Sequence, residues 1–212
     1  MTSMKVLADS LVGQQGVPEE LYQEFLSDIT EEIDRENKII TDLLSLVKMD
    51  KKAADMNIVN MNINELLENI LKRLRPIADQ RSIDLILDSF RPVTADVDEV
   101  KFTLAISNLV ENGIKYNVDE GWVRVTLDAD HKYFYVTVAD SGLGIPEDSI
   151  ERIFERFYRV DKSHSREIGG TGLGLAITRS SIVMHHGTIK VSSKEGEGTT
   201  FNVKIPLSYI PS

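Results

Sequence analysis

The sequence predicts an α+β protein: a two-layer α/β sandwich in which helices cover one face of a mixed sheet, preceded by an α-helical hairpin. Three observations favour this class. A long stretch near the N-terminus carries apolar residues at helical spacing, and residues 123–139 and 188–205 alternate apolar and polar residues as half-buried strands do. The segments between these regions have helical periodicity, and such a mixture favours helices packed on one side of a sheet.

The N-terminal part, residues 1–56, is predicted to be a helical hairpin with arms of unequal length. A short pattern from Met4 to Leu11 forms the first arm, and the second is a helix from about residue 18 to the low 50s. This helix begins with Pro18 and is acidic, since residues 19–42 hold nine acidic and two basic residues. Its apolar stripe consists of Leu21, Phe25, Ile29, Ile33, Ile40, Leu43 and Val47. Because the first arm is short, we expect a second copy of the chain or upstream residues to cover this stripe.

Residues 57–212 are predicted to form the sandwich. Asn64 is the expected cap of its first helix, and Asp96-Val97-Asp98-Glu99 resembles a capping box at the start of the second. In chain order we expect a strand at 58–63, a helix at 64–80, short apolar stretches at 83–87 and 93–94, a helix from 96 to about 116, strands at 123–127 and 133–139, a short helix, a helix from about 171 to 187, and strands at 188–193 and 199–205.

The composition argues against several functional classes. A formal net charge of −10 and a pI near 4.9 argue against a nucleic-acid partner, because phosphate backbones require clustered Lys and Arg. Cysteine is absent, so the chain has no thiolate metal site and no cysteine nucleophile. No apolar run approaches the roughly 20 residues that span a bilayer, and no basic amphipathic stretch predicts direct membrane contact.

An asparagine-rich helix segment is the first candidate for a functional site. The sequence NLVENGIKYN places Asn108, Asn112 and Lys115 at i, i+4 and i+7, on one helical face, with Tyr116 beside them. A neutral amide oxygen together with substrate phosphates suits Mg²⁺, and a Lys ammonium suits a phosphate. The alternative for this segment alone is a polar, solvated helix face.

Three glycine-containing segments follow. In DSGLGIP, Asp140 comes directly after a strand, where its carboxylate could accept from the adenine amine and would repel the guanine carbonyl. IGGTGLGLAI, from Ile168 to Ile177, precedes an apolar helix whose first N–H groups suit a phosphate. It is not a phosphate-binding loop of the Walker type, because Leu175-Ala176 stand where Lys and Ser or Thr are required. GEGTTF, from Gly196 to Phe201, is a turn into the last strand. Each segment alone is compatible with an ordinary loop.

In this order and spacing the segments resemble the asparagine box and the three glycine boxes of the sensor histidine kinase catalytic domain, a member of the superfamily that includes gyrase, Hsp90 and MutL. The counterpart of the phenylalanine box is IFERFYRVD, from Ile153 to Asp161. The resemblance covers about residues 58–208. The N-terminal hairpin resembles the dimerisation and phosphotransfer region of the same family.

The resemblance implies that ATP and Mg²⁺ bind to the second unit. Asn112 would be the metal ligand, and Asn108, Asn112 and Lys115 would form the catalytic set. Asp140 would read the adenine amine, with Thr199 supporting this contact through a water, and residues 158–171 would be a mobile lid. The implied nucleotide-binding residues are Asn108, Asn112, Lys115, Tyr116, Asp140, Gly142, Gly144, Ile145, Tyr158, Arg159, Gly170, Thr171, Gly172, Leu173, Gly174, Leu175 and Thr199.

One position separates a transferase from a hydrolase. The ATP-hydrolysing relatives carry a water-activating Glu where this chain resembles them at Asn108, and an amide cannot take a proton at neutral pH. We therefore expect the γ-phosphate to await an imidazole nucleophile. Glu111 is expected to point elsewhere on the helix and to be structural. The alternatives are an ATPase of the gyrase or Hsp90 type and a non-catalytic nucleotide-binding interaction module.

The family's phosphoacceptor histidine box has no counterpart in this chain. His131 lies in a predicted turn, His164 in the predicted lid, and His185 and His186 end a predicted helix, where a cation suits the dipole. We therefore expect a truncated chain that binds Mg-ATP but cannot phosphorylate itself. The parent would be a homodimer that passes the phosphoryl group to a response-regulator receiver domain, whereas the oligomeric state of this chain stays open. The chain would be the cytoplasmic part of a membrane-anchored parent.

Overall fold

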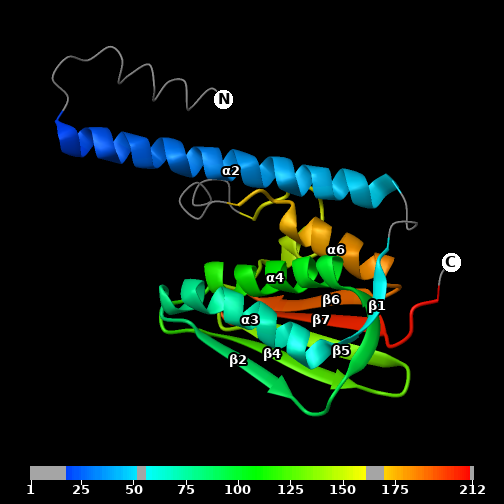
Figure 1. Ribbon diagram of the computed structural model, residues 1–212. Coiled ribbons are helices and arrows are strands. Elements are labelled where there is room, and N and C mark those ends of the chain that lie inside the picture. The colour runs from blue at the N-terminus through cyan, green and yellow to red at the C-terminus, as the bar shows by residue number, and fades with distance from the viewer. Residues whose placement is uncertain (1–17, 52–55, 161–169, 211–212) are drawn as a thin grey trace.

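A computed structural model describes residues 18–51, 56–160 and 170–210 of the chain. A long helix, α2, extends over a two-layer unit in which helices cover one face of a sheet (Figure 1). The predicted α+β class is confirmed, including the mixed sheet with helices on one side. The first arm of the predicted hairpin, Met4 to Leu11, lies outside the described residues, and the division at residue 56 stays a prediction.

The helices and strands follow the predicted order, with small shifts at their ends. In chain order they are α2 (Glu19–Lys51), β1 (Ile58–Asn62), α3 (Ile63–Asp79), β2 (Asp84–Ser89), β3 (Thr94–Asp98), α4 (Glu99–Lys115), β4 (Trp122–Ala129), β5 (Tyr133–Asp140), the 3₁₀ turn η2 (Glu147–Ser149), α6 (Gly174–Met184), β6 (Thr188–Lys194) and β7 (Gly198–Pro206). The last helix begins later than the expected Thr171. Gly172 has a φ of +69°, a left-handed conformation that no helical residue adopts.

The strands form two sheets. The main sheet has the order β2-β4-β5-β7-β6, with β2 parallel to β4 and the other neighbours antiparallel. The first predicted strand does not join it, because β1 pairs with β3 in a separate two-stranded sheet. Alternate residues of the central strands β4 and β5 face the helices and are buried, namely Val123, Val125, Leu127, Phe134, Val136 and Val138.

The N-termini of α3 and α4 are capped by side chains. Asp98 accepts the Lys101 N–H at 3.0 Å and caps α4. The predicted capping box from Asp96 to Glu99 is wrong, because Asp96 belongs to β3 and the helix begins only at Glu99. The prediction of Asn64 as the cap of α3 is wrong, because the capping side chain is Asn62, which accepts from the N–H groups of Asn64 and Glu65. Asn64 instead accepts the Val93 N–H at 2.8 Å, so it fastens the loop before β3 to the helix.

A buried histidine ties the end of α6 to the start of α4. His185 Nε2 accepts the Asp98 N–H at 2.9 Å, and Nδ1 lies 2.7 Å from the Ser181 carbonyl, so the ring proton is on Nδ1. The expectation of a cation at His185 is wrong, because Nε2 accepts an N–H and therefore carries no proton, and burial lowers the pKa of this ring. The ring is an uncharged link between two elements far apart in the sequence.

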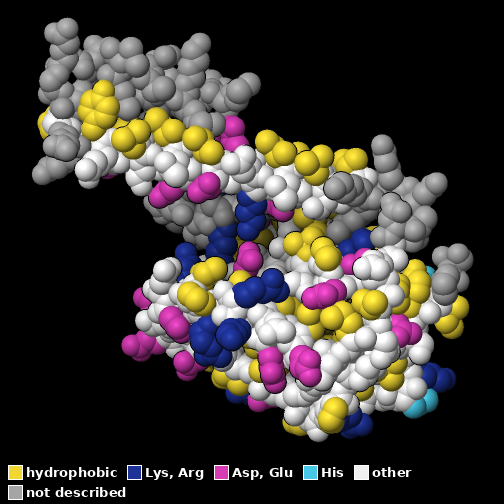
Figure 2. Space-filling model, in the orientation of Figure 1, with side chains coloured by type: hydrophobic (Ala, Val, Ile, Leu, Met, Phe, Trp, Pro, Cys, Tyr) yellow, Lys and Arg dark blue, Asp and Glu magenta, His cyan; other side chains and the backbone are white. Residues whose placement is uncertain are grey.

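Helix α2 is docked through one buried residue among those described. Leu46 is 2% exposed and packs with Leu173 and Ile177 at the start of α6. A row of hydrophobic side chains remains along α2 (Figure 2), and it includes Ile33, Ile40, Leu43 and Val47 of the predicted stripe. Its exposed members are Tyr22, Leu26, Ile33, Ile40, Leu43, Leu44 and Val47. Within the described ranges, each helix is too short or too polar to cross a bilayer.

Candidate functional site

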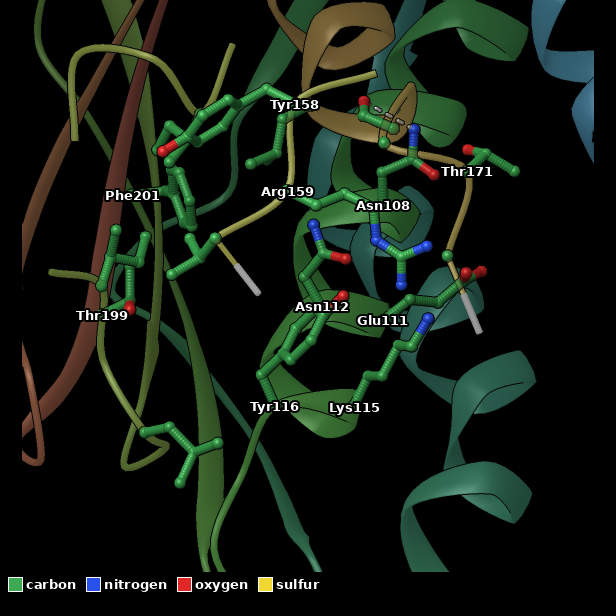
Figure 3. Close-up of a pocket in the computed structure, with 18 of the residues that line it drawn as sticks. Asn108, Glu111, Asn112, Lys115, Tyr116, Tyr158, Arg159, Thr171, Thr199 and Phe201 are labelled. Carbon is green, nitrogen blue, oxygen red and sulfur yellow. Dashed lines mark hydrogen bonds between the residues drawn. The ribbon is translucent and has the colours of Figure 1, made fainter. Parts of the chain in front are cut away.

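One cavity gathers most of the residues predicted for the site. Its volume is about 510 Å³, a size that suits a small-molecule ligand, and its walls come from α4, the end of β5, β7 and the segment before α6 (Figure 3). Gly142 and Leu173 of the predicted set do not line it. The predicted residues that do are Asn108, Asn112, Lys115, Tyr116, Asp140, Gly144, Ile145, Tyr158, Arg159, Gly170, Thr171, Gly172, Gly174, Leu175 and Thr199.

Helix α4 presents its polar face to the cavity because its other face is buried in the core. Phe102 and Leu109 on the buried face are at most 1% exposed. Asn108, Asn112 and Lys115 project from the opposite side toward the cavity, as the spacing predicts (Figure 3). The amide nitrogen of Asn108 donates to the Gly174 carbonyl at 3.2 Å and so joins α4 to the first residue of α6.

Cations surround the part of the cavity predicted for phosphates. Desolvation, together with the neighbouring charges of Lys38, Arg159 and Arg81, lowers the pKa of Lys115 to about 8, whereas Glu111 opposes this shift. In Figure 2 Lys and Arg side chains gather between α2 and the sandwich. A bound polyanion would offset this mutual repulsion, so the electrostatics favour phosphate.

Helix α2 contributes two residues that the sequence analysis missed. Lys38 and Asp42 line the mouth of the cavity, and Asp42 Oδ2 accepts from the Thr171 hydroxyl at 2.8 Å. The expectation that Glu111 points elsewhere is wrong, since it lines the same cavity and its Oε2 lies 3.3 Å from Lys38 Nζ. Both charges of this pair are substantially exposed, so the pair contributes about 0–1 kcal/mol. Both contacts join residues far apart in the chain, and no local pattern indicates them.

Asp140 lies at the opposite end of the cavity, as the last residue of β5. Its Oδ1 accepts the N–H groups of Gly142 at 2.9 Å and Thr199 at 3.2 Å. Burial raises the pKa of this carboxyl, while these two hydrogen bonds lower it. Gly142 therefore does not line the cavity; its N–H orients the Asp140 carboxylate.

The loop after β5 passes close to the β6–β7 hairpin. Gly144 has a φ of +70°, and a Cβ there would lie 2.1 Å from the Lys194 carbonyl oxygen. Only glycine permits this approach. The Gly196 N–H donates to the Leu143 carbonyl at 2.7 Å and fastens the same loop. Phe201 of β7 also lines the cavity and was not predicted, although strand alternation places it on the same face as Thr199.

The two ends of the predicted lid meet at one point. The Phe157 N–H donates to the Gly172 carbonyl at 2.9 Å. Tyr158 is held by its hydroxyl, which donates to Ser149 Oγ at 2.9 Å, and by the Arg152 guanidinium, which lies 4.3 Å from the ring centroid. Residues 161–169 of the predicted lid lie outside the described residues.

The donor set of the cavity fits a cation that arrives with its own phosphate ligands. Among the described residues, no group of three or more His, Cys, Asp or Glu could hold a metal ion. Asn112 offers a neutral amide oxygen to the cavity, and Mg²⁺ typically combines one or two protein oxygens with phosphate oxygens and water. The residues present therefore fit Mg²⁺ bound to a nucleotide and do not form an all-protein metal cage.

The cavity has a half-buried carboxylate at one end, an amide and ammonium face at the other, and glycine-rich loops between them. These features define a nucleotide-binding α+β protein. The chain belongs to the family described as "Histidine kinase-, DNA gyrase B-, and HSP90-like ATPase", which matches residues 97–209. Within this family it carries the ATP-binding catalytic domain of a sensor histidine kinase. The resemblance drawn from the sequence is thereby confirmed.

Similar proteins include two sensor kinases named WalK. The chain is 32% identical over 209 residues to that of Bacillus subtilis (strain 168), covering 97% of this chain and 34% of the relative. It is 32% identical over 212 residues to that of Staphylococcus aureus, covering 99% of this chain and 51% of the relative. The chain thus spans about a third to a half of the length of these relatives.

Solved structures have the same fold. The catalytic domain of histidine kinase ThkA is 28% identical, with a TM-score of 0.64 over 72% of this chain and 97% of that chain. The complex of ThkA with the response regulator TrrA is 24% identical, with a TM-score of 0.79 over 97% of this chain and 57% of that chain. AdeS of Acinetobacter baumannii is 22% identical, with a TM-score of 0.77 over 97% of this chain and 94% of that chain. The last two show the likeness of fold alone.

We expect the affinity for ADP to fall as the pH rises above about 8. Phosphate oxygens stabilise the protonated Lys115, so binding raises its pKa above the value of about 8 in the free protein. Below pH 8, Lys115 is protonated in both the free and the ADP-bound protein, so the affinity is constant. Between the free and bound pKa values binding takes up a proton, and the association constant falls about tenfold per pH unit. Calorimetry in two buffers of different ionisation enthalpy measures both the association constant and the number of protons taken up on binding.

The matched control for this prediction is Lys115→Arg, whose guanidinium stays charged in this range. Its affinity should show no decline above pH 8 and no proton uptake. A wild-type affinity that is constant to about pH 9.5 would contradict the prediction.

Proposed function

We propose that the chain binds Mg-ATP in this cavity as the phosphoryl donor of a two-component sensor kinase. In the parent protein the γ-phosphoryl group would pass to a histidine outside this chain and then to an aspartate of a response-regulator receiver domain. In the first step an imidazole nitrogen forms the N–P bond, the P–O bond to ADP breaks, and the imidazole proton is released.

The observation that carries this proposal is Asn108. Its side chain lines the cavity, where the hydrolysing relatives have a carboxylate, and its amide is held on the Gly174 carbonyl. An amide cannot accept a proton from water at neutral pH, so this position provides no general base for hydrolysis. The γ-phosphoryl group is thereby kept for a stronger nucleophile.

The other residues divide between the two ends of the nucleotide. Asn112 would hold Mg²⁺, which when bound neutralises charge on the phosphate oxygens. Lys115 and Arg159 would contact phosphates, and Asp140 would accept from the adenine amine with Thr199 beside it. The remaining predicted residues that line the cavity would also contact or support the nucleotide, namely Tyr116, Gly144, Ile145, Tyr158, Gly170, Thr171, Gly172, Gly174 and Leu175.

Three features of the parent are proposed from α2 and from the relatives. A second copy of the chain would cover the exposed apolar row of α2, because the described residues leave it uncovered. A receiver domain is the proposed partner, since ThkA was crystallised with a response regulator. The chain would be the cytoplasmic part of a membrane-anchored kinase, because it is similar to sensor kinases over nearly its whole length.

Calorimetric titration with Mg-ATP tests the proposed function. We expect saturable binding, no comparable binding of Mg-GTP, weaker binding when EDTA removes the metal, and a flat baseline after saturation. A sustained heat of hydrolysis would support an ATPase of the gyrase or Hsp90 type and overturn the role given to Asn108. A chain that binds no nucleotide would be a non-catalytic interaction module.

A further inference from the structure

The hydroxyl of Ser193 contacts three groups at the Asp140 end of the cavity. Ser193 is on β6, directly opposite Thr199 on β7. The Ile145 N–H donates to Ser193 Oγ at 2.8 Å, and Ser193 Oγ lies 2.8 Å from the Gly198 carbonyl oxygen. The third contact joins Ser193 Oγ and Thr199 Oγ1 at 2.9 Å. One oxygen thus connects the loop after β5 with the hairpin that carries Thr199.

The chemistry of these partners determines the direction of each hydrogen bond. A hydroxyl has one hydrogen to donate and two lone pairs that accept. The Ile145 N–H can only donate, and the Gly198 carbonyl can only accept, so the Ser193 proton goes to Gly198. In the remaining contact Ser193 must accept, and Thr199 must donate. The Thr199 proton is therefore engaged, and this hydroxyl presents only lone pairs to the cavity.

The consequence is that the side chains of Asp140 and Thr199 both present acceptors to this end of the cavity. Thr199 lines the cavity beside Asp140, and its backbone N–H donates to the Asp140 carboxylate at 3.2 Å. A carboxylate and a hydroxyl held as an acceptor both match an amine, either directly or through a water. A carbonyl at the same position of a purine would meet lone pairs from both groups.

We infer that Ser193 is a positioning residue that sets the preference of the site for a 6-amino purine over a 6-oxo purine by holding the Thr199 hydroxyl as an acceptor. This inference rests on the proposed nucleotide site. Without the Ser193 oxygen, the Thr199 proton loses its acceptor and can turn toward the cavity. A donor there weakens an amine contact and suits a carbonyl.

Binding of ADP and IDP to Ser193→Ala tests the inference, because these nucleotides differ at the 6-position of the purine. We expect the ratio of ADP to IDP affinity to fall about five- to tenfold, since one hydrogen bond changes direction. Ser193→Thr keeps the hydroxyl and should keep the ratio. Ser192→Ala is the matched control, because Ser192 is the exposed neighbour on the same strand. In a Thr199→Val background Ser193→Ala should no longer change the ratio.

Two outcomes would overturn the inference. Equal weakening of ADP and IDP by Ser193→Ala would mean that Ser193 only braces the loop, and an unchanged ratio with unchanged affinities would show that Thr199 does not depend on it. Should Ser193→Ala fail to fold by circular dichroism, Ser193→Cys weakens the same hydrogen bonds and is expected to lower the ratio likewise. A wild-type chain that binds neither nucleotide would overturn the proposed function as well, so the two failures are distinguishable.

Discussion

Replacing Asp140 with alanine is expected to lower the affinity for ADP at least about 100-fold, because several losses coincide. The nucleotide loses a charged acceptor in a half-buried site. The N–H groups of Gly142 and Thr199 also lose the oxygen that accepts from both, so the loop and the hairpin that form this end of the cavity are less well ordered. Each loss of this kind costs about 1–3 kcal/mol. Titration calorimetry of the variant against ADP measures the change.

Asp140→Asn separates the two causes. The amide oxygen can still accept from both N–H groups, whereas the amide nitrogen presents a donor where the carboxylate presented an acceptor. We expect this variant to remain folded, to bind ADP weakly and to gain affinity for IDP. Asp84→Ala, an exposed acid on β2, should bind ADP like the wild type. An Asp140→Ala variant that binds ADP within about threefold of the wild type would contradict the adenine contact.

The second large effect concerns the core beneath the site. Phe102→Ala is expected to lower the free energy of unfolding by about 3–5 kcal/mol. Phe102 is fully buried on the inner face of α4, with its ring centroid 5.8 Å from that of Phe134 on β5. Removing the ring leaves a cavity between α4 and β5. The polar face of α4 and the end of β5 carry residues of the proposed nucleotide site. Urea denaturation followed by circular dichroism measures the change.

Phe90→Ala provides the control for the core prediction. Phe90 is 71% exposed and follows β2, so its truncation should change the free energy of unfolding by less than about 0.5 kcal/mol. A Phe102→Ala variant destabilised by less than about 1 kcal/mol would contradict the packing of α4 on the sheet.

Local periodicity was sufficient to predict the order of the helices and strands and one face of the site. Asn108, Asn112 and Lys115 share a face because 3.6 residues make a helical turn, wherever the helix lies. Asp140 was predicted for a similar reason, since an acid directly after a strand lies at the edge of the sheet. Cap positions were less certain, as Asn62 and Asn64 show, because both side chains can accept from nearby N–H groups and the loop before β3 engages one of them.

The sequence by itself therefore determined the class of fold, the family and the residues that face the cavity from within a single element. Only the tertiary structure showed that Lys38 and Asp42 of α2 reach the cavity, that Leu173 packs against Leu46, and that the Ser193 hydroxyl lies within hydrogen-bond distance of the Thr199 hydroxyl. It also determined the lowered pKa of Lys115, which depends on burial and on charges from three other segments. The physical reason is that periodicity and turn chemistry act between neighbours in the chain, whereas burial, electrostatics and the direction of a hydrogen bond depend on groups brought together by packing.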